Sequence, residues 1–163
     1  MKKYQKNWLP VNIGHRQERR IKSLAKKSGE SWVNTLGDLT LLDYINAQRQ
    51  DGMIDFSCRS EAGKIILPRG HIVQVQTFKR KFEPISDDVH VISESQIKED
   101  ADILAFLTYN YIAKVMWLHG VTTKKQFLKQ PAHNKESARY HLDFGALFPV
   151  DTLTSLCATS PES

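Results

Sequence analysis

The chain has 163 residues, of which 40% are hydrophobic and 25% charged, and its formal net charge is +5. This length and composition fit one globular domain with its own core, so a repeat array or a disordered chain is not expected. No apolar run reaches the roughly 18 to 20 residues that span a bilayer, and residues 1–8 lack the apolar centre of a signal peptide. We therefore expect a cytoplasmic protein that does not enter a membrane. Cys58 and Cys157 lack Cys-x-x-Cys spacing, which indicates neither a zinc site nor a disulfide framework.

The positive charge is concentrated at the N-terminal end. Residues 1–27 hold nine basic residues and one acid, Glu18, for a net charge of +8, so residues 28–163 sum to −3. A local positive patch attracts polyanions by counterion release, which favours nucleic acid as the partner and an acidic membrane surface second. The plain alternative is a solvated helix face that binds nothing.

Hydrophobic periodicity and turn residues predict helices and strands in alternation. Residues 15–27 are predicted as a basic amphipathic helix ended by Gly29, whereas residues 30–42 fit either a broken helix or a loop before a strand. The strands predicted next are 44–49, 53–57, 64–67, 71–78, 103–107, 113–118 and, at a sheet edge, 140–142. Short helices are predicted from Ser93, from Thr123 and over 149–153, with a polar loop at 131–139.

No linker divides these elements. We predict a basic N-terminal arm over residues 1–14, a single α/β domain over 15–158 and a loose tail over 159–163.

The order of these segments resembles the PD-(D/E)xK nuclease superfamily over roughly residues 14–153. The likeness is carried by an aspartate on one strand, a hydrophobic-Gln-hydrophobic pattern on the next, and three later segments. These read Ala-Asp-Ile-Leu-Ala-Phe-Leu (101–107), Val-Met-Trp-Leu-His-Gly-Val-Thr-Thr-Lys-Lys-Gln-Phe-Leu (115–128) and Leu-Phe-Pro-Val-Asp-Thr-Leu (147–153). The resemblance implies a restriction-endonuclease-like fold, in which helices flank a mixed central sheet.

The resemblance also implies a catalytic site. Asp55 matches the metal-binding aspartate, and Gln74 matches the second ligand position, where the superfamily also uses glutamine. The position of the catalytic lysine is occupied by Gln76. Glu18 resembles the glutamate that many members carry on a helix beside the metals, and Glu30 is the rival for that role.

A lysine lies close to the position that Gln76 occupies. Lys79 lies three residues beyond Gln76, so on a regular strand its side chain points from the opposite face. A bulge would turn Lys79 inward, as relocated lysines do in this superfamily. Whether Lys79 reaches the site is therefore a question of strand geometry.

Phosphodiester hydrolysis needs a cation that offsets phosphate charge and activates water, and oxygen ligands such as Asp55 suit Mg²⁺, with Mn²⁺ as a substitute. We expect a magnesium-dependent endonuclease acting on double-stranded DNA, with RNA, a homodimer and a larger protein partner left open. The alternatives are an inactive nuclease-fold module that binds DNA or docks on a partner, and a pure protein-interaction domain. The residues expected to contact phosphates are Arg16, Arg19, Arg20, Lys26, Lys27, Lys79, Arg80 and Lys81.

Overall fold

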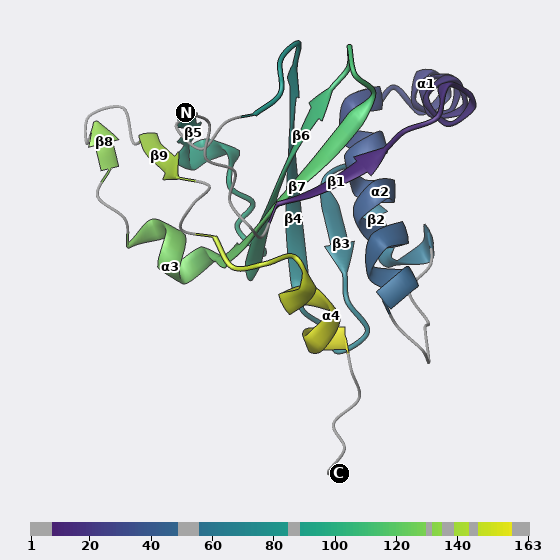
Figure 1. The fold of residues 1–163 in the computed structure, drawn as a ribbon. Helices are drawn as coiled ribbons and strands as arrows, with labels where there is room; N and C mark the ends of the chain where they lie inside the picture. Colours follow the sequence, from purple (N-terminus) through teal and green to yellow (C-terminus); the bar gives the residue numbers. More distant parts are fainter. Residues whose placement is uncertain are drawn as a thin grey trace.

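An open six-stranded mixed sheet forms the centre of the molecule (Figure 1). The structure is a computed structural model, and it describes residues 8–48, 56–84, 89–129, 132–134, 139–143 and 147–157. From one edge to the other the strands are β1 (Leu9–Asn12), β7 (Val115–Thr123), β6 (Ile103–Asn110), β4 (Ile72–Arg80), β3 (Lys64–Ile66) and β2 (Arg59–Glu61). Strands β4 and β6 run parallel, and the other neighbours are antiparallel. The α/β class expected from the sequence is thus confirmed.

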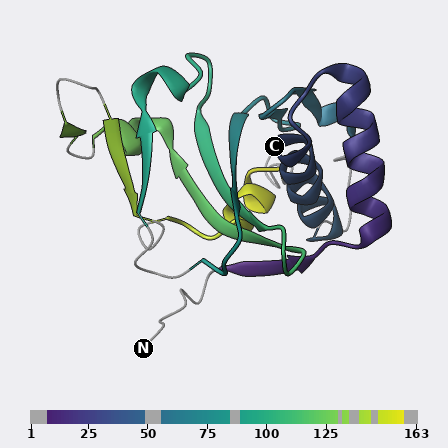
Figure 2. The same cartoon turned by 90° about the horizontal axis from the view of Figure 1, so that it is seen from above.

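The sheet is the middle of three layers (Figure 2). One face is covered by three helices, α1 (His15–Ser28), α2 (Trp32–Gln48) and α4 (Asp151–Cys157). The other face packs against α3 (Lys124–Leu128) and a second sheet with the strand order β5 (Val89–Ser93), β9 (Arg139–Asp143) and β8 (Ala132–Asn134). Among the described segments, no helix is both long and apolar enough to cross a membrane.

Strand β6 separates two hydrophobic cores. All eight of its residues are buried, as expected for a strand covered on both faces. Because successive side chains alternate, Ala105 and Leu107 pack in the core under α2, whereas Leu104 and Phe106 pack in the second core with Phe127 of α3. The two faces of the sheet therefore have separate surroundings, which decides which predicted site residues can meet.

Helix α2 settles the ambiguity at residues 30–42 in favour of a helix, and it corrects the strand predicted at 44–49. The helix continues through Gln48, and its buried side chains lie around most of its circumference. It packs between the sheet, α1 and α4, and a helix covered on several sides shows no single apolar stripe. For this reason its sequence does not display the helical period clearly.

Several other predicted elements are confirmed with shifted bounds. The helix at 15–27, the strand at 71–78 and the paired strands at 103–107 and 113–118 are present as α1, β4, β6 and β7. Strands β2 and β3 form around the Ala62-Gly63 turn, where the sequence predicts a turn and a short strand at 64–67. The final helix begins at Asp151, two residues later than expected.

Other predictions are wrong or lie outside the described residues. Phe56–Cys58 forms a 3-10 turn, which contradicts the end of the strand predicted at 53–57, whereas Asp51-Gly52 and Met53 to Asp55 lie outside the described residues. The predicted edge strand at 140–142 is β9, which lies in the middle of its sheet. Part of the predicted polar loop is β8, and β5 was not anticipated.

Two further differences concern the ends of predicted segments. The helix from Ser93 is a single 3-10 turn that ends at Gln96, where the Gln96 side chain accepts the Ser93 backbone N–H at 2.8 Å. Residues 9–12 of the expected N-terminal arm form β1, which pairs with β7. The tail over 159–163 lies outside the described residues.

A close contact between α2 and β4 yields a stability test. A Cβ atom added at Gly37 would lie 1.9 Å from Oγ1 of Thr77, so an alanine fits only if the helix or the strand moves. Alanine favours a helix over glycine by about 1 kcal/mol, whereas overpacking a core costs about 1–3 kcal/mol. We expect Gly37→Ala to lower the free energy of unfolding by up to about 2 kcal/mol in urea denaturation. Ser23→Ala, on the exposed side of α1, should not destabilise, and equal effects of the two substitutions would contradict this packing.

Candidate nucleic-acid interface and the predicted metal site

Helix α1 presents a basic face to solvent. Its buried residues Glu18, Ile21 and Ala25 fall on one side, as the helical turn of about 100° per residue requires. The residues on the opposite, exposed side include Arg16, Arg19, Arg20, Lys26 and Lys27. Within the described parts of the chain none of these five cations has an ion-pair partner, and Glu18 is the only acid of α1. The described part of the basic segment therefore places five cations on the exposed side of one helix.

The ends of α1 set its length and direction. The helix begins after Gly14, whose backbone is extended, and stops at Gly29, which has a φ of 75°. The Gly29 backbone N–H donates to the carbonyl of Ala25, and the left-handed conformation costs glycine little. Lys26 and Lys27 occupy the last turn, where positive charge complements the helix dipole.

The only acid of α1 is turned inward and attaches the helix to the sheet. Glu18 is 5% exposed, and its two carboxylate oxygens lie 2.9 and 2.8 Å from Nζ of Lys114. The Tyr109 hydroxyl also donates to Glu18, and Lys22 lies 3.0 Å away on the next turn of α1. Burial alone would raise the pKa of Glu18, but the hydrogen bonds from Lys114, Tyr109 and Lys22 outweigh it and lower the pKa to about 2. The carboxylate is thus charged under all ordinary conditions.

The conformation of the turn between β6 and β7 places Lys114 beside Glu18. Its backbone has a φ of 59°, in the left-handed region that lysine rarely adopts. The side-chain oxygen of Asn110 accepts the backbone N–H groups of Ile112 and Ala113 at 3.1 and 3.0 Å, which tightens the turn. The turn therefore supports a conformation that is costly for Lys114 alone.

The two glutamines of the predicted metal site hold the connection that precedes β6. The Gln74 amide donates to the carbonyl of Gln96 at 2.7 Å and accepts the backbone N–H of Lys98 at 2.7 Å. The Gln76 amide lies 3.5 Å from the same carbonyl of Gln96, a much weaker contact. Gln74 is 3% exposed, and both ends of its amide are engaged. Its role in the structure is to position the Gln96 to Lys98 segment.

A cavity adjoins these glutamines where β3 begins beside β4. It has a volume of about 390 Å³, and its lining includes Asn34 of α2, Gly63 of the β2–β3 turn, Gln74, Gln76 and Lys98. The lining is rich in amides and carries one cation. It is the place where the resemblance would locate the metal ligands.

Lys79 does not enter this cavity. The pairing of β4 with β6 is unbroken from Val73 to Arg80, so no bulge turns Lys79 toward the face of Gln76. Its ammonium lies instead 5.3 Å from the ring centre of Trp32 and 4.8 Å from that of Tyr111. The two neighbouring cations expected to contact phosphates differ, since Arg80 is half-buried and Lys81 is exposed.

Glu18 and Gln74 are also separated by the sheet. Tyr109, the partner of Glu18, packs in the core under α2, whereas Gln74 pairs with Leu104, whose side chain faces the second core. Tyr109 lies five residues along β6 from Leu104, which corresponds to roughly 16 Å of strand. The carboxylate and the amide therefore belong to different sites.

Glu30, the rival candidate, is part of a third group. Its carboxylate accepts from Arg59 at 2.8 Å and from the Thr35 hydroxyl at 3.0 Å. The hydrogen bond from Arg59 lowers the pKa of Glu30. Arg59 also binds Asp38 at 2.7 Å, so one guanidinium is shared by two carboxylates.

Asp38 is a buried acid that sequence reasoning missed. It is fully buried on α2, and its Oδ2 atom accepts the backbone N–H of Gly63 at 2.8 Å as well as the Arg59 bond. Burial raises the pKa of Asp38 to about 6, against the opposing effect of Gly63 and Arg59. An aspartate between Leu36 and Leu39, within the leucine-rich run of residues 36–42, was the available signal. The network joins α2 to β2 and to the β2–β3 turn beside the cavity.

The described members of the predicted catalytic group do not converge on one point. Gln74 is committed to the backbone, Glu18 lies on the other face, and Lys79 points away. Within the described ranges no three His, Cys, Asp or Glu residues gather as metal ligands do. Asp55 lies outside the described residues, so its role stays a prediction.

Comparison with known proteins adds no family. Protein-family models, curated proteins and solved structures gave no match to this chain. Its function is therefore inferred from its own residues.

Removing the Glu18 charge tests the attachment of α1. The folded-state pKa of about 2 lies below the ordinary value of 4.5, so the stabilisation is complete above pH 4.5 and is lost as the pH falls toward 2. We expect Glu18→Gln to lower the free energy of unfolding near pH 7 by up to about 3 kcal/mol. The difference from the wild type should shrink in urea titrations as the pH falls below 4.5. A difference that stays constant with pH would contradict the ion pair.

Charging Gln74 tests its structural role. In Gln74→Glu a carboxylate oxygen would face the Gln96 carbonyl in a buried place, so we expect a loss of about 2 kcal/mol near pH 7. The loss should become smaller at acid pH, where a protonated carboxyl donates a hydrogen bond again. Gln76→Glu is the matched control, because its side chain is more exposed and its contact is weak. Equal thermal stabilities of the two variants would refute the assignment.

Proposed function

We propose that the protein binds nucleic acid through the basic face of α1, with double-stranded DNA as the expected polymer. The observation that carries this proposal is the stripe of five exposed cations on α1, none of which has an ion-pair partner among the described residues. A cation without a partner contributes the full free energy of counterion release when it contacts a phosphate, whereas a paired cation must first break its own ion pair.

The dimensions of α1 suit this role. Arg16 and Lys27 are eleven residues apart, which corresponds to roughly 16 Å along a helix. Double-stranded DNA carries one charge per about 1.7 Å, so this length of duplex presents about nine or ten phosphates. The stripe is therefore long enough to contact several phosphates at once. Because these contacts read no base edges, binding is expected to be largely independent of sequence.

We also propose that the scaffold is of the restriction-endonuclease-like kind. The arrangement that supports this is a helix, α2, followed by the antiparallel strands β2, β3 and β4 and then by β6 parallel to β4. The resemblance stated from the sequence implies a helix followed by a mixed sheet, with ligand positions on the strand that β4 represents. It also implies a crossover helix after that strand, where the structure has β5 and a 3-10 turn. Many α/β domains share parts of this arrangement, so the order supports the proposal without identifying a family.

Binding is favoured over cleavage as the function of the described residues. Gln74 holds a backbone segment with both ends of its amide, and Lys79 points to the other face of β4. Neither is free to act on a cation or water beside Gln76. Magnesium- or manganese-dependent cleavage, the other function implied by the resemblance, depends on Asp55 and is the second outcome of the experiment below.

The experiment is fluorescence anisotropy with labelled DNA duplex, single-stranded DNA and RNA of the same sequence. Affinities are compared at about 50 and about 200 mM salt without divalent ions, a range over which phosphate contacts weaken strongly. We expect the triple variant Arg16→Gln, Arg20→Gln and Lys27→Gln to lose more than tenfold in affinity. Its slope of log K against log salt should fall by about 0.9 for each contact removed. Glutamine keeps the helix propensity, so folding should be unaffected.

The control removes the same charge elsewhere. Arg69, Lys125 and Lys129 are exposed cations on the β3–β4 turn and around α3. Changing all three to glutamine should alter affinity by less than about twofold. Equal losses in the two triple variants, or binding that does not depend on salt, would overturn the proposal. Cleavage of the duplex on adding Mg²⁺ or Mn²⁺, abolished by Asp55→Ala, would assign catalysis to the chain.

A further inference from the structure

Three lysines meet three aromatic rings beside the basic face of α1. We call this the lysine–aromatic cluster, and its members are Lys22, Lys79, Lys114, Trp32, Tyr109 and Tyr111, grouped around Glu18. They come from five places in the chain: α1, the start of α2, the end of β4, the end of β6 and the β6–β7 turn. Trp32 and Tyr109 meet edge to face with ring centres 5.9 Å apart.

The lysines of the cluster are held in two different ways. Lys22 and Lys114 both bind the Glu18 carboxylate. Lys79 has no ion pair with any described residue, and its ammonium lies 5.3 Å from the ring centre of Trp32 and 4.8 Å from that of Tyr111. Lys22 also lies 4.6 Å from the ring centre of Trp32. Trp32 therefore contacts two ammonium groups at once.

Charge does not balance in this cluster. Three ammonium groups face one carboxylate, so the cluster carries a net charge of about +2. An aromatic ring attracts an ammonium group without neutralising it, in contrast to a carboxylate partner. The rings therefore restrict the position of the Lys79 ammonium and leave its charge available. A long lysine side chain otherwise loses considerable rotamer freedom when it binds an anion, and this restriction reduces that cost.

The separation between the Lys22 and Lys79 ammonium groups limits the size of the anion that can contact both. The distances from Trp32 allow Nζ of Lys22 and Nζ of Lys79 to be no more than about 10 Å apart. Two ammonium groups can contact different oxygens of one phosphate at a separation of up to about 8 Å, because each N–O contact is about 2.8 Å. Both lysines are exposed, and their flexible stems can close the remaining gap.

We propose that Lys79 and Lys22 of the lysine–aromatic cluster seat a phosphate group of a bound nucleic acid backbone. The inference rests on the proposed function, because Lys22 lies on α1 one turn from Lys26 and so extends the basic face toward β4. A phosphate is favoured over a base, since ammonium groups already occupy positions over the Trp32 ring. The ammonium of Lys79, whose position the two rings restrict, thus adds one phosphate contact to those of the basic face.

The test measures binding of the same duplex to single variants of the full chain. Lys79→Gln should lower affinity about threefold to tenfold and reduce the salt slope by about 0.9. Lys79→Arg keeps the charge and stacks on aromatic rings, so it should restore affinity to within about twofold. Lys125→Gln on α3 is the control for charge alone and should change affinity by less than about twofold.

A second variant tests the part played by the ring. Trp32→Leu leaves every charge in place, yet it should lower affinity about threefold, because Lys79 loses one of its two ring contacts and Lys22 loses its ring contact. Because Trp32 is half-buried, the thermal unfolding of the Trp32→Leu variant is measured as well. If that variant does not fold, the comparison of Lys79→Gln with Lys79→Arg still tests the proposal. Tryptophan fluorescence strongly quenched by single-stranded DNA would indicate base stacking on Trp32 and overturn the phosphate assignment.

The failures of the two proposals are distinguishable. If the wild type shows no salt-dependent binding, the proposed function fails and the phosphate seat fails with it. If the wild type binds and the triple variant of α1 is weakened, but Lys79→Gln behaves like Lys125→Gln, only the phosphate seat is refuted.

Discussion

The buried carboxylate of Glu18 is the contact on which the arrangement of the basic face depends. It is the one acid among the basic residues of α1, and Lys114, Tyr109 and Lys22 bind it from the sheet and from the helix itself. A charge with this little exposure is costly unless it is fully paired, so the helix can rotate only by breaking those bonds. With Glu18 fixed inward, helical geometry turns the stripe from Arg16 to Lys27 outward.

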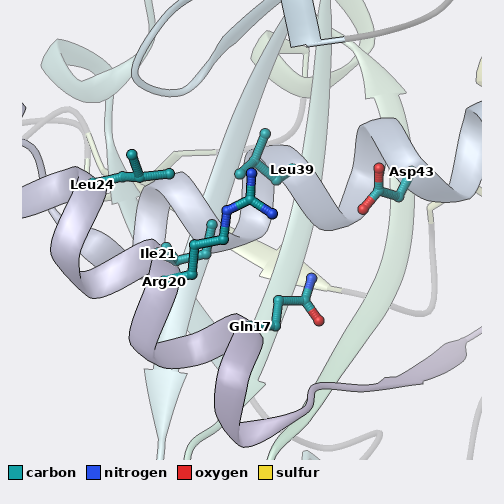
Figure 3. Close-up of a pocket in the computed structure, with 6 residues that line it drawn as sticks. All are labelled: Gln17, Arg20, Ile21, Leu24, Leu39 and Asp43. Carbon is teal, nitrogen blue, oxygen red and sulfur yellow. The ribbon is translucent and has the colours of Figure 1, made fainter.

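A groove beside this contact shows how α1 meets α2. Gln17, Arg20, Ile21 and Leu24 of α1 face Leu39 and Asp43 of α2 around a cavity of about 210 Å³ (Figure 3). Burial raises the pKa of Asp43. Ile21, Leu24 and Leu39 supply the apolar part of the lining, and Gln17, Arg20 and Asp43 supply the polar part, so Arg20 of the basic face borders this groove. The basic face is thus built from the interior outward.

The two sides of β4 separate Gln74 and Gln76 from Lys79. On one side Gln74 organises the segment before β6, and on the other Lys79 contacts Trp32 and Tyr111. In a regular strand these residues cannot exchange faces, and the pairing with β6 is regular throughout. The question that the sequence raises about Lys79 is therefore answered by strand register, and the lysine contributes to the basic surface instead.

Local patterns predicted the elements with a clear period and failed where burial removed it. α1 has an apolar stripe and a glycine stop, and the glutamine alternation of β4 follows from a period of two, so both were predictable. α2 is buried on several sides and shows no single stripe, and the period of its sequence shortens toward two after Asp43, which favours a strand at 44–49. The pairing of Glu18 with Lys114 joins residues 96 positions apart, and no local pattern reports such a contact.

Lysine footprinting of the complex with duplex DNA tests directly whether the polymer lies on the basic face of α1. Acetylation of each lysine is followed by mass spectrometry with and without the DNA, using the full chain. We expect DNA to protect Lys26, Lys27 and Lys79 from acetylation. Lys125 and Lys129, which are exposed around α3, should react as in the free protein. Protection confined to Lys125 and Lys129, or equal protection of all five, would contradict this expectation.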